Sequence, residues 1–400
     1  MTTTRLDHLS VTNFRLFQTF EVDLHPELTV LVAANGAGKT AVLDALAVAL
    51  RYFVDSMMES STSHGFEKTD VRLALTEEGA MVPVLPTALE AIGLFGGLPT
   101  HWRRALRSMT GRTSYAEASE LGARASEYLR HLRDYADRRR SDAPVLPVLA
   151  YYGTGRLWSQ GKRSSSRKQA KATSFNRPLD AYLDALEPSS NYQSFKLWFK
   201  ATSYEQSREL ELALHPRAQL ALSTVRDATN RVLQEVDWKN LAWNFSADDL
   251  VAKHPRLGEL SVSLQSDGIR NSIAMVADLA HRCVRLNPQL GVDAHRRTPG
   301  IVLIDEVELH LHPAWQQSIV GLLRDAFPAV QFILTTHSPQ VLSTVPAESI
   351  RILSPASWDA TRTPGQQTKG VSSAEVLATV RGVDPFPALA EVPRNRSRPF

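Results

Sequence analysis

The sequence predicts an α/β fold in which a mixed sheet carries a phosphate-binding loop and a helical insertion interrupts the chain. Short runs of apolar, β-branched residues alternate with longer segments whose apolar residues recur at helical spacing. A glycine-containing loop joins the apolar run 28–32 to the helical pattern 40–53, in the order strand, loop, helix. A chain of 400 residues with 43% hydrophobic residues is long enough for one large domain with an insertion or for two lobes.

The chain is expected to consist of three parts. Residues 1–86 are expected to form an N-terminal lobe with the phosphate-binding loop. Residues 87–250 are expected to form the helical insertion, which includes one returning core strand at 144–152 and a basic loop at 159–173. Residues 251–400 are expected to form a C-terminal lobe that contains an acidic strand and a histidine-bearing strand.

The individual elements follow from hydrophobic periodicity and from turn residues. Helices are expected at 40–53, 87–140, 191–233, 269–285 and 313–327. Strands are expected at 6–12, 17–24, 28–32, 144–152, 259–264, 301–304 and 330–334. One helix separates the last two strands, which predicts that they are parallel neighbours.

Charge is unevenly distributed along the chain, although the formal net charge is +3. Residues 101–140 contain ten Lys and Arg against five Asp and Glu, and residues 161–180 contain six against one. These stretches predict either a basic surface for a polyanion such as nucleic acid, or solvated loops and a charged helix face. Cys283 is the single cysteine, and no apolar run approaches the ~20 residues of a membrane helix, so we expect a cytoplasmic protein without membrane contact.

The loop after residues 28–32 has the composition of a P-loop. In such a loop glycines let backbone N–H groups turn toward phosphates, a lysine bridges the β- and γ-phosphate oxygens, and a hydroxyl residue holds Mg²⁺. The residues expected to bind ATP are Asn35, Gly36, Ala37, Gly38, Lys39 and Thr40. Ala33 replaces the first glycine of the pattern, at a strand end where alanine can be tolerated. The alternative is a glycine-rich strand-to-helix turn without a ligand.

A second motif is an apolar strand, 301–304, that ends in two acids. Asp305 is expected to hold Mg²⁺ together with Thr40, as in a Walker B element. Glu306 is expected to orient the attacking water as the general base, and Glu308 is a second candidate for that base. The alternative for the adjacent acids is a surface turn.

Three histidines follow the acidic strand. His337 comes at the end of strand 330–334 and is expected to act in catalysis by sensing the γ-phosphate at the same sheet edge as the acids. His310 and His312 have no convincing third metal ligand, so a loop-packing role is favoured over zinc.

The helix 269–285 is preceded by Ser266, Asp267 and Gly268. These residues offer hydroxyl and N–H donors at a helix N-terminus, where they could bind an anion or cap the helix. The order of the motifs along the chain favours a role in the nucleotide site.

Taken together, the motifs and the segment 13–17 resemble the ABC-type ATPases of the SMC/RecF class. The segment 13–17 reads Asn-Phe-Arg-Leu-Phe, similar to the N-terminal segment of that class, and Ser266 and Gly268 lie where the class has its LSGGQ signature. Asp267 replaces the first glycine of the signature, and Gln265 replaces its leucine. The resemblance implies an ABC-type ATPase head that binds ATP and Mg²⁺ and hydrolyses ATP slowly.

Further segments resemble the small bacterial ATPases of antiphage defence, among them the Septu and retron-associated ATPases. These segments are 150–158, 305–313, 336–339 and 368–384. The resemblance implies an ATP-bound head-to-tail homodimer or higher oligomer, an HNH nuclease as partner, and restriction of phage infection. In that arrangement Lys39, Asp305 and His337 come from one subunit, and Ser266 and Gly268 from the other.

Three function classes fit these motifs. The first is a defence ATPase that controls a nuclease partner, and the second is a RecF/SMC-like DNA-repair ATPase that binds DNA directly. The third is a transporter subunit, but the 227 residues between Lys39 and Ser266 are far more than such subunits use. The chain has no recognisable nuclease motif of its own.

Overall fold

The structure is a computed structural model of the chain. It describes residues 3–60, 65–114, 116–139, 142–155, 177–188, 192–212, 216–354, 357–364 and 367–371. The predicted basic loop 159–173, most of the segment 368–384 and the end of the segment 150–158 lie outside these described residues.

A ten-stranded mixed sheet is the centre of the fold. In order across the sheet the strands are β7 (Leu98–Leu106), β6 (Thr87–Phe95), β1 (Arg5–Phe14), β2 (Phe17–Asp23), β15 (Ser357–Arg362), β14 (Ile350–Ser354), β3 (Leu28–Val32), β13 (Val330–Thr336), β12 (Gly300–Ile304) and β8 (Val148–Tyr152). The strands β3, β13, β12 and β8 are parallel, whereas β7, β6, β1 and β2 are antiparallel. The fold is therefore the mixed α/β architecture that the sequence predicts.

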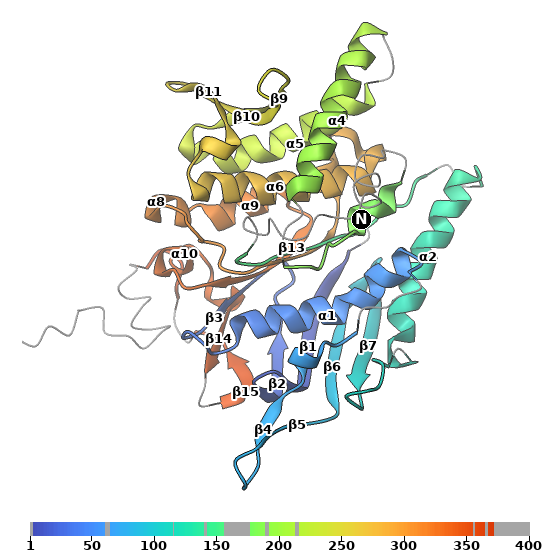
Figure 1. Cartoon of the computed structure of the whole chain (residues 1–400), viewed down its shortest axis with the longest axis vertical. Coiled ribbons are helices and arrows are strands. Elements are labelled where there is room, and N and C mark those ends of the chain that lie inside the picture. Colours follow the sequence, from blue (N-terminus) through green and yellow to red (C-terminus); the bar gives the residue numbers. More distant parts are fainter. Residues whose placement is uncertain are drawn as a thin grey trace, which may run out of the picture.

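Helices lie against this sheet, as Figure 1 shows. The helix α1 (Lys39–Met57) lies beside β1 and β6 and contacts α2 (Ser119–Ala136). Beyond β13 are α5 (Arg217–Leu233), α6 (Asp267–Leu286) and α9 (Ile319–Ala326), with α4 (Tyr192–Glu211) farther out. The shorter helices are α7 (Ala294–Arg297), α8 (Pro313–Gln316) and α10 (Pro339–Leu342). Separate small sheets are formed by β9 (Lys239–Asn244), β10 (Asp249–His254) and β11 (Gly258–Ser261), and by β4 (Leu73–Leu75) and β5 (Met81–Pro83).

The central strands are apolar because both of their faces are covered. Every residue of β3, β12, β13 and β8 is buried. Parallel strands covered on both faces read as continuous apolar runs rather than as an alternation, which is the pattern that made them recognisable in the sequence. Most residues of α1 are buried, and many of them are alanine, valine or leucine, so the helix packs closely on the sheet.

The predicted helix at 87–140 is confirmed only as α2, from Ser119 to Ala136, with a 3₁₀ turn at Ala116–Ala118 before it, and it is wrong over residues 87–106. These residues form the hairpin β6–β7, in which Phe95 pairs with Leu98 across Gly96 and Gly97. Both glycines have positive φ, +64° and +80°, which suits a two-residue hairpin turn. The sequence of β6 is rich in leucine and alanine and also fits a helix. Pairing of β6 with β1 extends the sheet, and this tertiary contact outweighs the local preference for a helix. The division of the chain into two lobes and an insertion stays a prediction.

Other elements agree with the sequence or differ in detail. The predicted strands 6–12, 17–24 and 28–32 are confirmed as β1, β2 and β3. The predicted helix 191–233 appears as α4 and α5, which the structure separates before Pro216. The predicted helix 313–327 is divided into α8 and α9. The predicted strand 259–264 is shorter, because β11 ends at Ser261 and a 3₁₀ turn follows.

Part of the basic stretch 101–140 is paired within the chain, although its ten arginines outnumber its five acids. Arg103 and Arg107 both pair with Glu117, and Arg133 pairs with Glu59. Such internal pairing favours a charged surface rather than a free polyanion site. Among the helices that the structure describes, none is long and apolar enough to cross a membrane.

Buried polar groups join the helices to the sheet. Asp278 on α6 accepts a hydrogen bond from the Tyr152 hydroxyl at 2.9 Å and one from Arg282 Nε at 2.7 Å. His281, one turn along, packs beside two aromatic rings, with its centroid 4.3 Å from that of Trp198 and 5.9 Å from that of Phe195. Asp278 and Arg282 are almost fully buried, so each of these two charged side chains stabilises the other.

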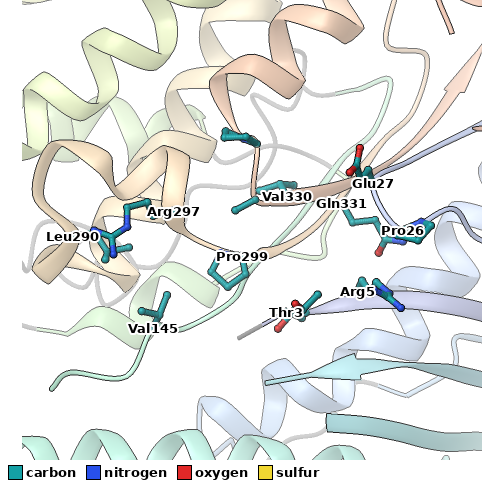
Figure 2. A pocket seen from close by; sticks show the side chains of 13 residues that line it. Thr3, Arg5, Pro26, Glu27, Val145, Leu290, Arg297, Pro299, Val330 and Gln331 are labelled. Atoms are coloured by element: carbon teal, nitrogen blue, oxygen red, sulfur yellow. The ribbon is translucent and has the colours of Figure 1, made fainter. Parts of the chain in front are cut away.

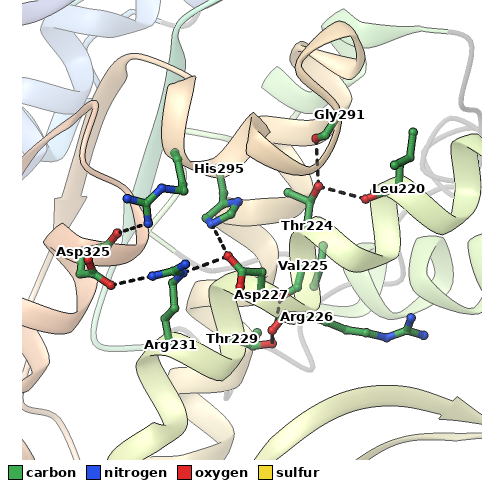
Figure 3. Close-up of polar contacts among 11 residues, drawn as sticks. Leu220, Thr224, Val225, Arg226, Asp227, Thr229, Arg231, Gly291, His295 and Asp325 are labelled. Atoms are coloured by element: carbon green, nitrogen blue, oxygen red, sulfur yellow. Dashed lines mark hydrogen bonds and ion pairs between the residues drawn. The ribbon is translucent and has the colours of Figure 1, made fainter.

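A second polar network connects α5 with α7 and α9 (Figure 3). Arg231 donates to Asp227 at 2.9 Å and to Asp325 at 3.0 Å, and His295 Nε2 lies 3.1 Å from Asp227. The side chain of His295 is buried, and this burial lowers its pKa. The network therefore fixes the helical layer by directional contacts in addition to apolar packing.

His281 makes stability depend on pH. Burial lowers its pKa to about 4, against the opposing effect of Asp278, whereas the unfolded chain binds the proton below about pH 6.5. Stability is therefore unaffected above this range and falls as the pH drops from about 6.5 to about 4. We expect the His281 contribution to destabilise the protein by about 2 kcal/mol at pH 5 relative to pH 7.5.

Urea unfolding of the parental chain and of His281→Phe at the two pH values measures this effect. The substitution keeps a ring beside Trp198 and Phe195 but removes the titrating group, so the loss of stability between pH 7.5 and pH 5 should be smaller by about the same amount. Equal losses in the two proteins would show that His281 is not responsible.

Candidate nucleotide-binding site

One open cleft is lined by residues of the predicted phosphate loop, the acidic strand and the histidine strand. Its volume is about 770 Å³, and it is lined by Arg15, Leu16, Asn35, Gly36, Gly38, Lys39, Thr40, Ala41, Asp305, Glu306 and His337. The cleft lies where β3, β13 and β12 end, because Val32 is level with Thr336, and Ile304 with Leu334. Ligands of open α/β sheets bind at this carboxyl edge.

The phosphate loop has the conformation that its glycines allow. Gly36 and Gly38 have φ of +76° and +89°, in the left-handed region that lets successive N–H groups turn to one side. A side chain at Gly38 would place its Cβ 2.6 Å from Phe17, whereas Gly36 faces open space. Lys39 Nζ donates to the Ala33 carbonyl at 3.1 Å, so the side chain lies back along the loop.

Ala33 fits the position of the missing glycine. It is buried and is not among the described residues with positive φ. The departure from the P-loop pattern therefore costs no backbone strain at this point.

The two residues predicted to hold a metal face each other. Thr40 Oγ1 donates to Asp305 Oδ2 at 2.8 Å, and the other Asp305 oxygen accepts from Thr335 Oγ1 at 2.5 Å. Hydroxyl and carboxylate oxygens are the ligands that Mg²⁺ prefers, and both lie at the N-terminus of α1, where phosphates also bind favourably. The oxygens of Thr40 and Asp305 therefore fit Mg²⁺ bound together with a nucleoside triphosphate.

The two candidates for the general base, Glu306 and Glu308, lie in different positions. Glu306 lines the cleft in a left-handed conformation, with φ of 48°, and its N–H donates to Thr335 Oγ1 at 2.8 Å. Glu308 is not among the described residues that line the cleft. Its carboxylate accepts from Thr336 Oγ1 at 2.8 Å and from the His337 N–H at 2.5 Å. Of the two candidates for a general base, Glu306 alone lines the cleft.

Residues 8–236, more than half of the chain, match the family model described as AAA domain, and residues 252–343 match a second AAA domain model. The chain belongs to the AAA domain family.

Individual relatives of this AAA domain chain are similar over different lengths. The Retron Vc95 probable ATPase of Vibrio cholerae serotype O1 biovar El Tor is 26% identical over 391 residues, covering 87% of this chain and 73% of that protein. The Septu protein PtuA of Bacillus mycoides (strain KBAB4) is 47% identical over 74 residues, 18% of this chain and 10% of that one. An SMC head bound to the C-terminal winged-helix domain of ScpA aligns at 13% identity over 90% of this chain and 98% of that one, with a TM-score of 0.48.

Arg15 belongs to the segment 13–17 noted for its resemblance, but neither it nor the residues that contact it were predicted as site residues of this AAA domain chain. Arg15 lines the cleft, donates to Asp70 at 3.0 Å and also pairs with Asp44. Asp44 accepts from the Tyr151 hydroxyl at 2.8 Å. Burial raises the pKa of Asp44, against the opposing effects of Arg15 and Tyr151. Asp44 lies four residues after Thr40, so helical spacing was a usable signal, whereas the approach of Tyr151 depends on the fold.

Burial alone would lower the pKa of Arg15, but the carboxylates of Asp44 and Asp70 outweigh it and raise that pKa. The guanidinium is therefore held as a cation beside the cleft. Asp44 and Asp70 balance this charge within the chain, so Arg15 lines the cleft as a paired cation.

The predicted signature residues lie outside the cleft. Ser266 is exposed at the N-terminus of α6, and its side chain accepts no capping hydrogen bond from the residues that the structure describes. The Asp267 carboxylate pairs with Arg270. A side chain at Gly268 would place its Cβ 2.4 Å from the His310 carbonyl, so α6 approaches the segment after the acids closely. The structure does not bring these three residues to the phosphate loop of the same chain.

The two other histidines belong to a turn. His312 Nδ1 accepts from the Ala314 N–H at 3.3 Å and caps α8. His310 has a positive φ of 63°. The capping contact gives His312 a local structural role.

A second cavity, of about 330 Å³, lies at the opposite edge of the sheet and is shown in Figure 2. It is lined by residues at the start of β12 and β13, including Pro299 and Val330. Two of the charged side chains at its wall have partners, since Arg5 pairs with Asp7 at 2.7 Å and Glu27 pairs with Arg324. It contains none of the predicted site residues.

Substitution of the two loop glycines tests the geometry of the phosphate loop. Gly38→Ala and Gly36→Ala both introduce a side chain at positive φ, but the methyl group at position 38 also meets Phe17, which is buried and stacked 4.6 Å from Phe20. We expect Gly38→Ala to lower the free energy of unfolding by about 1–3 kcal/mol more than Gly36→Ala does. Urea unfolding of the two variants measures the difference. Equal destabilisation would mean that Phe17 does not constrain this loop.

Proposed function

We propose that this chain is an ATP-binding and ATP-hydrolysing switch of antiphage defence that acts in the cytoplasm as an ATP-dependent dimer and regulates an associated nuclease. The observation that supports it best is the convergence of Lys39, Thr40, Asp305, Glu306 and His337 on one cleft. Similarity to proteins named as a retron probable ATPase and as Septu protein PtuA supports the assignment to defence.

The cleft residues have distinct roles in this proposal. The loop from Asn35 to Thr40, including Gly36, Ala37 and Gly38, binds the phosphates through backbone N–H groups, and Lys39 reaches the β- and γ-phosphate oxygens. Thr40 and Asp305 hold Mg²⁺, which neutralises phosphate charge when bound.

Hydrolysis in this proposal depends on two further residues. Glu306 orients the attacking water and accepts its proton, and His337 senses the γ-phosphate. Both line the same cleft as Asp305. Arg15, which is paired with Asp44 and Asp70, also lines this cleft.

A second copy completes the site. Ser266 is exposed and is not among the described residues that line the cleft of its own chain, so it is accessible to a nucleotide bound by a partner subunit. Gly268, proposed to contact the same γ-phosphate, is buried against the His310 carbonyl in the single chain. Asp267 belongs to the same segment at the N-terminus of α6. ATP then links two subunits, and hydrolysis separates them, so that the output of the switch is a change of assembly. Turnover is expected to be slow, because it requires the assembled dimer or a higher oligomer.

The nuclease activity is assigned to a partner protein of the HNH type. The alternative is a RecF/SMC-like DNA-repair ATPase that binds DNA directly. The internal pairing of Arg103, Arg107 and Arg133 leaves the stretch 101–140 less suited to nucleic acid. A rise in the ATPase rate on addition of duplex DNA would favour the alternative.

Glu306→Gln tests the hydrolytic part of the proposal. The variant keeps the shape of the side chain but loses the base, so ATP binding should persist while kcat falls by a factor on the order of 10²–10⁴. In the presence of ATP and Mg²⁺ it should accumulate as a dimer, measured by light scattering. Lys39→Ala is the control, because it should lose ATP binding and remain monomeric. Hydrolysis by Glu306→Gln at the parental rate would rule out Glu306 as the base.

A further inference from the structure

The acidic segment after β12 contains a carboxylate that does not face the cleft. Asp305 and Glu306 line the cleft, whereas Glu308 hydrogen-bonds to the end of β13. Its two oxygens accept from different donors, Thr336 Oγ1 at 2.8 Å and the His337 N–H at 2.5 Å. A charged carboxylate that accepts a short backbone hydrogen bond fixes the donor more firmly than a neutral group would.

We propose that Glu308 is a positioning residue that holds the backbone of His337 and so sets the geometry with which this histidine meets the γ-phosphate. This inference rests on the proposed function, in which His337 senses that phosphate. Glu308 acts through His337 and does not touch the nucleotide itself.

The contacts around Thr336 support this role. Thr336 is fully buried, and its hydroxyl donates to Glu308 while it accepts from the Ser338 N–H at 3.0 Å. Ser338 Oγ in turn accepts from the Gln340 N–H at 3.1 Å and begins α10. The short segment that includes His337 is therefore held by Glu308 on one side and by α10 on the other.

Loss of the Glu308 carboxylate removes the acceptor of two donors at once. Thr336 Oγ1 and the His337 N–H would each have to find another partner, and the backbone at His337 could shift. A displacement of about 1 Å in a positioned group can lower a rate by a factor on the order of 10². Binding of the α- and β-phosphates depends on the separate phosphate loop and should be little affected.

Nucleotide discrimination tests the inference without requiring turnover. The dissociation constants of AMP-PNP and ADP are measured calorimetrically with Mg²⁺ for the full chain, Glu308→Ala, Glu308→Gln and Glu77→Gln. Glu77 is exposed in the turn between β4 and β5 and is the matched control for loss of a carboxylate. We expect Glu308→Ala to reduce the preference for AMP-PNP over ADP by about tenfold, with the ADP constant unchanged, and Glu308→Gln to have a smaller effect. Glu77→Gln should match the parental chain.

A double-mutant cycle with His337→Ala separates positioning from a general effect on folding. If Glu308 acts through His337, Glu308→Ala should change nucleotide discrimination little further in the His337→Ala background. Thermal unfolding checks that each variant is folded. If Glu308→Ala does not fold, nucleotide discrimination by Glu308→Gln tests the positioning role instead.

Three outcomes would overturn the inference. Parental discrimination in folded Glu308→Ala or Glu308→Gln, or effects that add in the double mutant, would contradict the positioning role alone. A parental chain that binds AMP-PNP and ADP equally would contradict the proposed γ-phosphate sensing, and the role of Glu308 with it.

Discussion

The hydroxyl of Thr335 is the contact on which the arrangement of the site depends. It donates to Asp305 at 2.5 Å and accepts from the Glu306 N–H at 2.8 Å, so one buried side chain fixes both acids. Asp305 is itself buried, and a buried carboxylate is tolerated where hydrogen bonds satisfy its oxygens. Its second oxygen accepts from Thr40 at 2.8 Å, which joins the acidic strand to the helix that follows the phosphate loop.

Two sets of contacts connect Thr335 and Asp305 to the rest of the structure. Toward the cleft, the three parallel strands β3, β13 and β12 bring the phosphate loop, His337 and the acids to one edge. Toward the helical layer, the Asp305 N–H donates to the Tyr152 carbonyl at 2.8 Å, and the Tyr152 hydroxyl reaches Asp278 on α6. The same helix begins with the predicted signature. The acid of one site and the residues proposed for the partner's site are thus connected by packed, hydrogen-bonded groups.

Much of the site was predictable from the sequence because its main parts are local motifs. The glycines, Lys39 and Thr40 follow one another, and the acids come directly after an apolar strand. The contacts of Thr335, Asp44 and Tyr151 were missed, because they join segments far apart in the chain. Tyr151 and Asp44 are separated by 107 residues and meet through the placement of β8 beside β12. The hairpin β6–β7 was missed because its sequence fits a helix until β1 supplies a strand to pair with.

The central claim is that two chains share each nucleotide site. It is tested by mixing Lys39→Ala, which lacks the phosphate-binding lysine, with Ser266→Arg, which blocks the signature, and measuring ATP hydrolysis. If the site is shared, each variant alone is inactive, but a mixed dimer has one intact site. An equimolar mixture should then recover roughly a quarter to a half of the parental rate, because the mixed dimer, which ATP can close at its one intact site, makes up between half and all of the dimers. No recovery on mixing, or full activity of Ser266→Arg alone, would contradict the shared site.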